Sequence, residues 1–325
     1  MNHPRRRATL TCLAAGLLTA ALPAVSAAAY PDKPIRLVVP FPPGQGADIL
    51  ARLIGQHLAA ALGQPIVVEN KVGAGGIIGT AFAAKAAPDG YTLYMGSSGP
   101  LAIGPHVYKA VGFDTLKDFA PISNIASVTQ VLVTAPASQL ASAKDVVERA
   151  RAQPGMVPFG SAGSGTTSHL TMELFTQMSG ISLSHVPYKG SSTSMIDVMA
   201  GRVPLMFDSL PGVLTNVKSG SLRAIAVASA QRDPLLPNVP TVAESGVPGF
   251  ATSGWIGLLA PARTPPQIVD QLHIPQRLGH LLRVHRQETV VQPVARHRLA
   301  MRALALRDLV LMVREDQVEP AAMDK

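Results

Sequence analysis

The chain has 325 residues and a formal net charge of +8, and it is 47% hydrophobic but only 4% aromatic. The positive charge is spread out: Arg5, Arg6 and Arg7 carry +3, residues 31–272 carry +2, and residues 273–325 carry +3. Because residues 31–272 are nearly neutral and the chain has so few aromatic side chains, a nucleic-acid-binding surface is not expected. At about 100 to 200 residues per domain, the length accommodates one large or two smaller α/β domains.

The N-terminal segment, residues 1–29, has the residue order of a secretory signal peptide. Three arginines precede an apolar stretch over 10–24, and small residues follow up to Ala29. The apolar stretch is too short to span a bilayer comfortably. We therefore expect export, with cleavage near Ala29. Because the only cysteine, Cys12, lies in this segment, we predict a mature chain with no disulfide, thiolate metal site or cysteine nucleophile.

Between residues 30 and 272, short β-rich runs alternate with helical patterns. This order predicts an α/β fold with mostly parallel strands and with ligand-binding loops at the carboxyl ends of the strands. The predicted strands are 35–39, 66–68, 92–95, 122–133, 157–159, 183–186, 205–207 and 224–228. The predicted helices are 47–62, 77–87, 143–152, 167–179, 192–200 and 213–219.

The first predicted strand leads through a Pro/Gly-rich loop, residues 40–46, into a helix with an apolar stripe. The first four N–H groups of a helix are unpaired, so such a loop lets a small anion reach bare backbone donors. Asp48 lies in the first turn, where a carboxylate complements the positive helix end, and we interpret it as an organiser of the site. The candidate site residues of this loop are Phe41, Gly44, Gln45, Gly46, Ala47 and Asp48.

The same arrangement recurs after the predicted strand 157–159. A Gly/Ser-rich loop, residues 160–165, leads into another predicted helix. Two such loops, far apart in the sequence, predict two lobes that hold one small anion. We interpret His169 as a first-turn residue that helps to close the site. The candidate site residues here are Ser161, Ala162, Ser164, Thr166 and His169.

The serines of the second loop raise the alternative of a secreted α/β hydrolase, with Ser161 or Ser164 as nucleophile. A nucleophile elbow has the pattern Gly-x-Ser-x-Gly, but Phe159 and Ala162 stand two residues before these serines. Neither serine fits the motif, and spacing alone does not assemble a Ser/His/Asp triad. The hydrolase therefore stays the competing interpretation.

Four further candidates follow predicted strands, and each has two interpretations. Ser97 and Ser98 either donate hydroxyls to a carboxylate or form an ordinary turn. Tyr188 either faces the ligand cleft or belongs to a rigid turn. Asp208 either accepts a hydrogen bond from a ligand amine or hydroxyl, or orients its own loop. We interpret Asp208, like Asp48, as an organiser because an acid would repel a carboxylate ligand.

No cofactor or metal site is predicted. The glycines of residues 73–79 have the wrong spacing for a dinucleotide fingerprint, and no acidic residue follows about 20 positions later to hold a ribose. We interpret this run as a tight turn into a closely packed helix. His57 lies on or beside the apolar stripe of its helix without a metal-compatible partner nearby, so a packed helix residue is the better interpretation.

A series of short motifs then occurs in one order, almost without a break from Tyr30 to Leu272. These motifs are VPF (39–41), GQGAD (44–48), GQP (63–65), VEN (68–70), GAGG (73–76), PDGYT (88–92), DFAP (118–121), GSAG (160–163), HVPYKG (185–190), VPT (239–241) with Glu244, WIG (255–257) and AP (260–261). In this series the chain resembles the solute-binding receptors of tripartite tricarboxylate transporters, the Bug or TctC family.

The resemblance implies a type II periplasmic-binding-protein fold, with two lobes, a ligand cleft and a two-segment hinge. One lobe would comprise residues 30–130 and 250–272, and the other residues 131–249. The function implied is that of a non-enzymatic, monomeric periplasmic receptor. It would hold a small carboxylate by the loops 41–48 and 161–166, through backbone N–H groups, hydroxyls and ordered waters. The large and small membrane permease subunits are the expected partners, and a ligand sensor for a signalling partner is the alternative.

Two features depart from the family pattern. Gln45 stands where the family usually has a second glycine, which adds an amide donor and removes backbone freedom. From His273 onward the resemblance stops, and residues 273–325 contain no aromatic side chain. We interpret this tail as an out-of-frame reading of the original C-terminal coding sequence. Because it replaces helices that complete the first lobe, we expect a weakened receptor.

Overall fold

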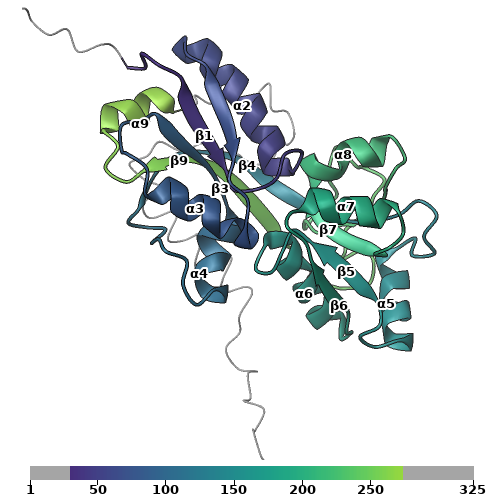
Figure 1. Ribbon diagram of the computed structural model, residues 1–325. Coiled ribbons are helices and arrows are strands. Elements are labelled where there is room, and N and C mark those ends of the chain that lie inside the picture. Colours follow the sequence, from purple (N-terminus) through teal and green to yellow (C-terminus); the bar gives the residue numbers. More distant parts are fainter. Residues whose placement is uncertain (1–29, 274–325) are drawn as a thin grey trace, which may run out of the picture.

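The computed structural model describes residues 30–273, so the predicted signal peptide and almost all of the atypical tail lie outside the described residues (Figure 1). Within this range the strands follow the order β2-β1-β3-β9-β4-β7-β5-β6, and β8 pairs with β4. The strands are β1 (Ile35–Val39), β2 (Ile66–Asn70), β3 (Thr92–Ser97), β4 (Phe119–Thr134), β5 (Pro158–Ser161), β6 (Ser184–Pro187), β7 (Leu205–Ser209), β8 (Arg223–Val227) and β9 (Ser253–Pro261).

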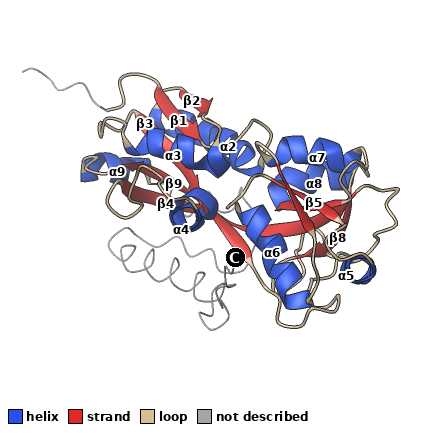
Figure 2. Ribbon diagram, turned by 60° about the horizontal axis from the view of Figure 1, so that its bottom comes forward, coloured by secondary structure: helices blue, strands red, loops and turns tan. Residues whose placement is uncertain are grey.

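The helices lie on both sides of these strands (Figure 2). They are α2 (Gly46–Leu62), α3 (Ile77–Ala84), α4 (Gly104–Val107), α5 (Ala143–Ala152), α6 (Thr167–Ser179), α7 (Ser191–Met199), α8 (Leu210–Lys218) and α9 (Pro266–Leu272), with single turns η1 (Ala74–Gly76) and η2 (Gly99–Ile103). Every predicted helix forms: α5 and α6 have the predicted ends, and the other four differ by one to three residues at an end. For example, α8 begins three residues earlier than predicted, because Pro211 lies in its first turn, where no N–H is needed. Within residues 30–273, no helix is long and apolar enough to cross a membrane.

The prediction of mostly parallel strands is wrong for the centre of the molecule. The pairs β1–β2, β1–β3, β5–β6 and β5–β7 are parallel. In contrast, β9 is antiparallel to β3 and β4, and β4 is also antiparallel to β7 and β8. The sequence did not reveal β9 because it is buried almost continuously, so the alternation of apolar and polar residues is missing.

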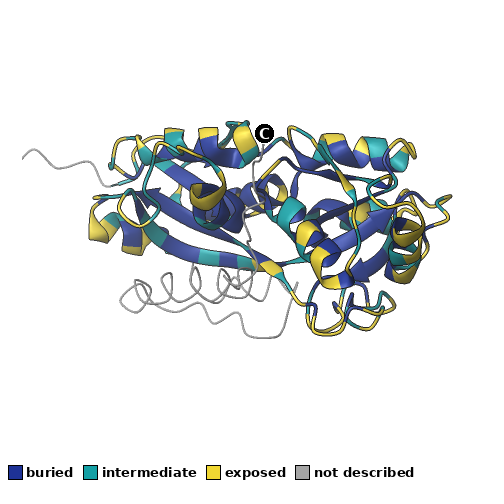
Figure 3. Ribbon diagram, turned by 90° about the horizontal axis from the view of Figure 1, so that it is seen from below, coloured by how far each residue is buried: buried dark blue, intermediate teal, exposed yellow. Residues whose placement is uncertain are grey.

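The hydrophobic cores divide the described chain into two halves, which Figure 1 shows side by side. In the β1 half (β1–β3, α2–α4, α9), the buried face of α2, with Leu50 and Ile54, packs against Ile35 of β1. In the β5 half (β5–β8, α5–α8), Phe159 and Phe207 belong to a separate buried cluster. β4 contributes to the cores of both halves. Figure 3 shows the buried residues concentrated along the strands of each half, with exposed residues on the outer helix faces.

Candidate functional site

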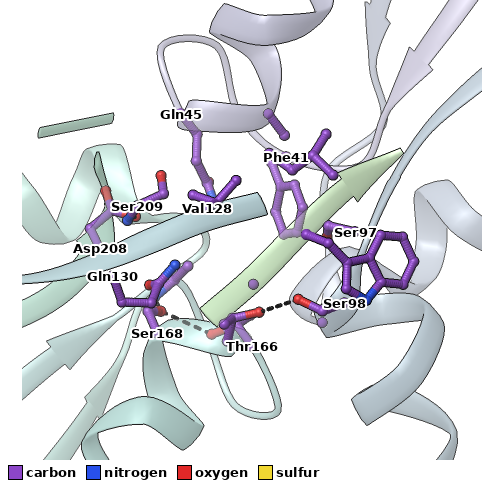
Figure 4. Close-up of a pocket in the computed structure, with 17 residues that line it drawn as sticks. Phe41, Gln45, Ser97, Ser98, Val128, Gln130, Thr166, Ser168, Asp208 and Ser209 are labelled. Atoms are coloured by element: carbon purple, nitrogen blue, oxygen red, sulfur yellow. Dashed lines mark hydrogen bonds between the residues drawn. The ribbon is translucent and has the colours of Figure 1, made fainter. Parts of the chain in front are cut away.

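A small pocket of about 50 Å³ lies where the two halves meet, at the carboxyl ends of β1, β3, β5 and β7 (Figure 4). It is bordered by the loops that follow these strands, by Val128 and Gln130 of β4, and by the first residues of β9. The residues that line it are Phe41, Gln45, Ala47, Ser97, Ser98, Gly99, Val128, Gln130, Ala162, Thr166, Thr167, Ser168, Asp208, Ser209, Gly254, Trp255 and Ile256. Both halves therefore contribute to one enclosed space.

A second pocket of about 370 Å³ adjoins the first, and both are lined by Phe41 and Ala162. Its wall is formed by residues 40–42, 72–76 and 187–190, with Tyr108 and the loop 162–164. The turn formed by residues 73–76 therefore lines the larger pocket, next to the two binding loops. The two pockets together offer room for a ligand longer than the first one alone could hold.

The structure brings most of the candidate residues together, but not all of them at the same surface. Those that line the smaller pocket are Phe41, Gln45, Ala47, Ser97, Ser98, Ala162, Thr166 and Asp208, and those that line the larger one include Ser164 and Tyr188. Five candidates line neither pocket: Gly44, Gly46, Asp48, Ser161 and His169. Of these five, Gly44, Asp48, Ser161 and His169 form hydrogen bonds that hold the two loops.

Sequence reasoning missed several lining residues. Gln130 and Trp255 reach the pocket from β4 and β9, and only the antiparallel crossing of these strands places them there. A signal for Gln130 exists, since this long polar side chain directly precedes the apolar end of a predicted strand, residues 131–133. Thr167 and Ser168 directly follow the candidate Thr166 and could have been included on that ground.

Asp48 fixes the shape of the first loop by hydrogen bonds on the side of the loop that does not line the pockets. Its carboxylate accepts hydrogen bonds from the Gly44 backbone N–H and the Asn70 amide, each at 2.9 Å, and from the guanidinium of Arg52 through two nitrogens. Burial opposes ionisation, but the hydrogen bonds from Arg52, Asn70 and Gly44 prevail and lower the pKa of Asp48. The side chain is therefore a charged organiser whose oxygens are already occupied.

Two helix N-termini meet at the smaller pocket. α2 begins at Gly46 and α6 begins at Thr167, and the first turns of both helices, including Ala47 and Ser168, line the pocket. The first backbone N–H groups of a helix lack intrahelical acceptors and carry a partial positive charge. Neither N-cap residue, Gln45 or Thr166, caps its helix with a side-chain hydrogen bond. This arrangement favours a small anion.

The second loop is held by a network of its own side chains. The Thr166 hydroxyl donates to the Gly163 carbonyl at 2.6 Å, and the Ala162 N–H donates to the Ser168 hydroxyl at 3.0 Å. The Gly163 N–H donates to the Ser161 hydroxyl at 3.1 Å. The loop is therefore fixed before any ligand arrives.

Ser161 lies 2.6 Å from Nε2 of His185, which superficially resembles a serine–histidine catalytic pair. However, Ser161 is fully buried and lines neither pocket. The carboxylate near this pair, Glu173, contacts His169 instead of His185. A nucleophile without access to substrate, beside a histidine that no described carboxylate orients, does not support acyl transfer.

Direct contacts join the two halves around the pockets. The Ser98 and Thr167 hydroxyls are 3.0 Å apart, and the Ser191 N–H donates to Oε1 of Gln45 at 3.3 Å. Gly190 packs so closely on Pro42 that a Cβ would collide with the proline ring, and its φ of +131° also favours glycine. The two halves are therefore in a closed arrangement.

Asp208 is the buried acid of the pocket. Its Oδ1 accepts the Ser209 N–H at 2.7 Å, while its Oδ2 accepts no hydrogen bond of normal geometry from the described residues. Burial raises the pKa of Asp208 to about 6, although the Ser209 N–H and the hydroxyls of Ser191 and Ser209 partly counter this effect. Within residues 30–273, no group of three or more His, Cys, Asp or Glu residues could hold a metal ion.

Comparison with known proteins relates the chain to periplasmic receptors. The model of the tripartite tricarboxylate transporter family receptor matches residues 50–279. The chain is 42% identical over 250 residues to the protein BugT of Bordetella pertussis, with 77% of each chain covered. It is 39% identical over 269 residues to the UPF0065 protein encoded in the tcbD–tcbE intergenic region of Pseudomonas sp. strain P51, with 82% of this chain and 80% of that protein covered.

Solved structures share the fold. The periplasmic binding protein BugD matches with 30% identity and a TM-score of 0.76, covering 87% of this chain and 96% of BugD. Rpa4515 of R. palustris, solved with adipate, matches with 34% identity and a TM-score of 0.76, covering 86% and 98%. MatC from Rhodopseudomonas palustris, solved with bound malate, matches with 27% identity and a TM-score of 0.74, covering 87% and 98%.

Proposed function

The chain belongs to the tripartite tricarboxylate transporter receptor family, the Bug or TctC proteins, and we propose that it binds one small carboxylate between its two halves and delivers it to a membrane permease. The observation that carries this proposal is the meeting of the α2 and α6 N-termini at one pocket. The receptor acts in the periplasm after removal of residues 1–29. Large and small permease subunits are its membrane partners.

The carboxylate is held by donors that require no cationic side chain. The first-turn amides of α2 and α6, at Ala47 and Thr167, supply backbone N–H groups, and Ser98 supplies a hydroxyl. Such donors are already fixed by the loops, so little ordering accompanies binding. The phenyl ring of Phe41 packs beside the ligand and forms part of both pockets.

The relatives with bound ligands support a dicarboxylate of about four to six carbons, since adipate lies in Rpa4515 and malate in MatC. One carboxylate occupies the smaller pocket, and a longer ligand extends into the adjoining space of about 370 Å³. Asp208 lines the smaller pocket and accepts a hydrogen bond from a hydroxyl or amine of the ligand when the ligand has one. A hydroxylated ligand is therefore preferred to its unsubstituted analogue.

Binding and release require opening of the closed arrangement. The lobes are residues 30–130 with 250–272, and residues 131–249, and the hinge lies where β4 and the segment before β9 pass between them. The receptor works as a monomer. Contacts such as Gln45–Ser191 form only when the lobes are closed, so they bias the equilibrium toward the bound state.

The test is calorimetry and thermal unfolding of the purified protein with adipate, malate and adipamide. Adipamide has the length of adipate but no negative charge. We expect both acids to raise the melting temperature and to give measurable heats, and adipamide to do neither. A shift with adipamide equal to that with adipate, or no shift with any acid in a wider panel, would refute the proposal. Steady hydrolysis of an ester substrate that is lost in Ser161→Ala would favour the hydrolase.

A further inference from the structure

Two histidines lie stacked directly behind the second binding loop. The ring of His185 on β6 packs 4.0 Å from that of His169 on α6, measured between centroids, and 4.9 Å from that of Phe159 on β5. Neither histidine lines a pocket. Each is nevertheless hydrogen-bonded to the loop, which raises the question of what the pair contributes there.

The hydrogen bonds assign the proton position in His169. Its Nδ1 accepts the backbone N–H of Gly165 at 3.2 Å, so this nitrogen carries a lone pair. The proton of the neutral ring therefore lies on Nε2, which faces Oε1 of Glu173 at 3.4 Å. A second proton on Nδ1 would place two donors face to face and break the contact with Gly165.

The same reasoning applies to His185 through Ser161. The Ser161 oxygen accepts the N–H of Gly163 at 3.1 Å, and the hydroxyl is fully buried. Its proton needs an acceptor, and among the described residues that acceptor is Nε2 of His185, 2.6 Å away. Nε2 therefore carries a lone pair. Protonation there would turn Nε2 into a donor and leave the buried Ser161 proton without an acceptor, so the hydroxyl would have to reorient beside the Gly163 N–H.

We propose that His169 and His185 are positioning residues that, as unprotonated acceptors, fix the Gly163 and Gly165 amides and so the shape of the carboxylate-binding loop. When acid protonates them, the loop loosens and the carboxylate is released. This inference rests on the proposed function, because the loop matters only if it holds the ligand. It adds a second source of pH dependence to a site whose smaller pocket already contains the titratable Asp208.

The surroundings determine the pH at which the two histidines are protonated. Glu173 is the one other charged residue of α6, and β5 and β6 contain no further titratable side chain besides His185. β7, which packs against α6, contributes Asp208. Burial lowers the pKa of His169, although Glu173 partly counters it. Burial, with the neighbouring His169, lowers the pKa of His185 to about 4. Two stacked imidazoles also resist carrying two charges, so protons enter one at a time.

The experiment compares three variants with the wild-type protein, with adipate as the probe. His185→Phe keeps a ring in the stack but removes the acceptor, and we expect it to bind adipate about tenfold more weakly near neutral pH. His185→Gln places a non-titrating amide oxygen near the position of Nε2 and should recover most of that loss. His57→Gln, on α2 and away from the loop, is the control.

The decisive readout is the pH profile. Between about pH 7.5 and about pH 3, which lies below the pKa of His185, we expect the wild-type protein and His57→Gln to lose about tenfold more affinity than His185→Gln does. Protonation of adipate itself affects all variants equally and cancels from this ratio. Parallel pH profiles for the wild-type protein and His185→Gln would overturn the inference.

A second measurement separates this inference from the proposed function. Amide hydrogen exchange of residues 160–166, without ligand and corrected for the intrinsic rate, should be about tenfold faster near pH 3 than near pH 7.5 in the wild-type protein, but not in His185→Gln. Unchanged protection in both would overturn the inference. If no variant binds adipate at any pH while the exchange result holds, the proposed ligand class is wrong but the histidine contacts do control the loop.

Discussion

The Tyr108 hydroxyl donates a hydrogen bond of 2.8 Å to the backbone carbonyl of Ser164, and this contact links the two halves of the molecule. Tyr108 directly follows α4 in the β1 half, while Ser164 lies in the binding loop of the β5 half. Both residues line the larger pocket. Closure and loop geometry are therefore coupled, because a carbonyl of the binding loop itself anchors the opposite half.

Tyr108→Phe tests this coupling. The substitution removes one hydrogen bond between the halves and leaves the ring in place, so the closed form is less favoured. We expect adipate to bind about fivefold more weakly, mainly through faster dissociation, as measured by stopped-flow fluorescence and calorimetry. Tyr91→Phe is the matched control, since the Tyr91 hydroxyl bonds to Asp32 on the surface, away from the pockets. Equal loss in both variants would contradict a role in closure.

Gln45→Glu tests the electrostatic character of the site. Gln45 lines the smaller pocket, and its Oε1 already accepts the Ser191 N–H, so glutamate would retain that bond while adding a negative charge near the bound anion. We expect about tenfold weaker binding of adipate, with a loss that shrinks as salt is added. Gln56→Glu makes the same change on the exposed face of α2 and should leave affinity within about twofold. An unchanged affinity in Gln45→Glu would place the carboxylate elsewhere.

Asp48→Asn tests the organiser of the first loop. The lowered pKa of Asp48 means that its charge stabilises the folded state above the ordinary carboxyl pKa, and that this contribution disappears as pH falls through the lower folded value. We therefore expect a loss of about 1 to 3 kcal/mol in unfolding free energy near pH 7 and a smaller loss near pH 3, measured by urea unfolding. Asp270→Asn, at an exposed position on α9, is the control. A pH-independent difference would contradict the charge argument.

The sequence predicted best those structural features that depend on residues close together in the chain. The helices that begin near Gly46 and Thr167 were predicted because apolar spacing and loop composition are local signals. The contributions of Gln130 and Trp255 depend on how β4 and β9 cross, which no local pattern records. The same holds for His185, whose role appears only when β6 is paired with β5.

The two interpretations of Asp208 can be separated by Asp208→Asn. The pKa of Asp208, about 6, lies above that of an exposed carboxyl. Ionisation of Asp208 therefore lowers the free energy of unfolding as the pH rises through 6. Removing the charge should raise the unfolding free energy by about 1 to 3 kcal/mol near pH 8 and change it little near pH 4, seen as a pH-dependent shift in melting temperature.

The same variant tests ligand preference. If the Asp208 carboxylate accepts a hydrogen bond from the ligand, the preference for malate over succinate should also fall, because the variant replaces a charged acceptor with an amide. A stability gain with an unchanged malate preference would mean that Asp208 only orients the Ser209 loop, and Asp270→Asn should show neither effect.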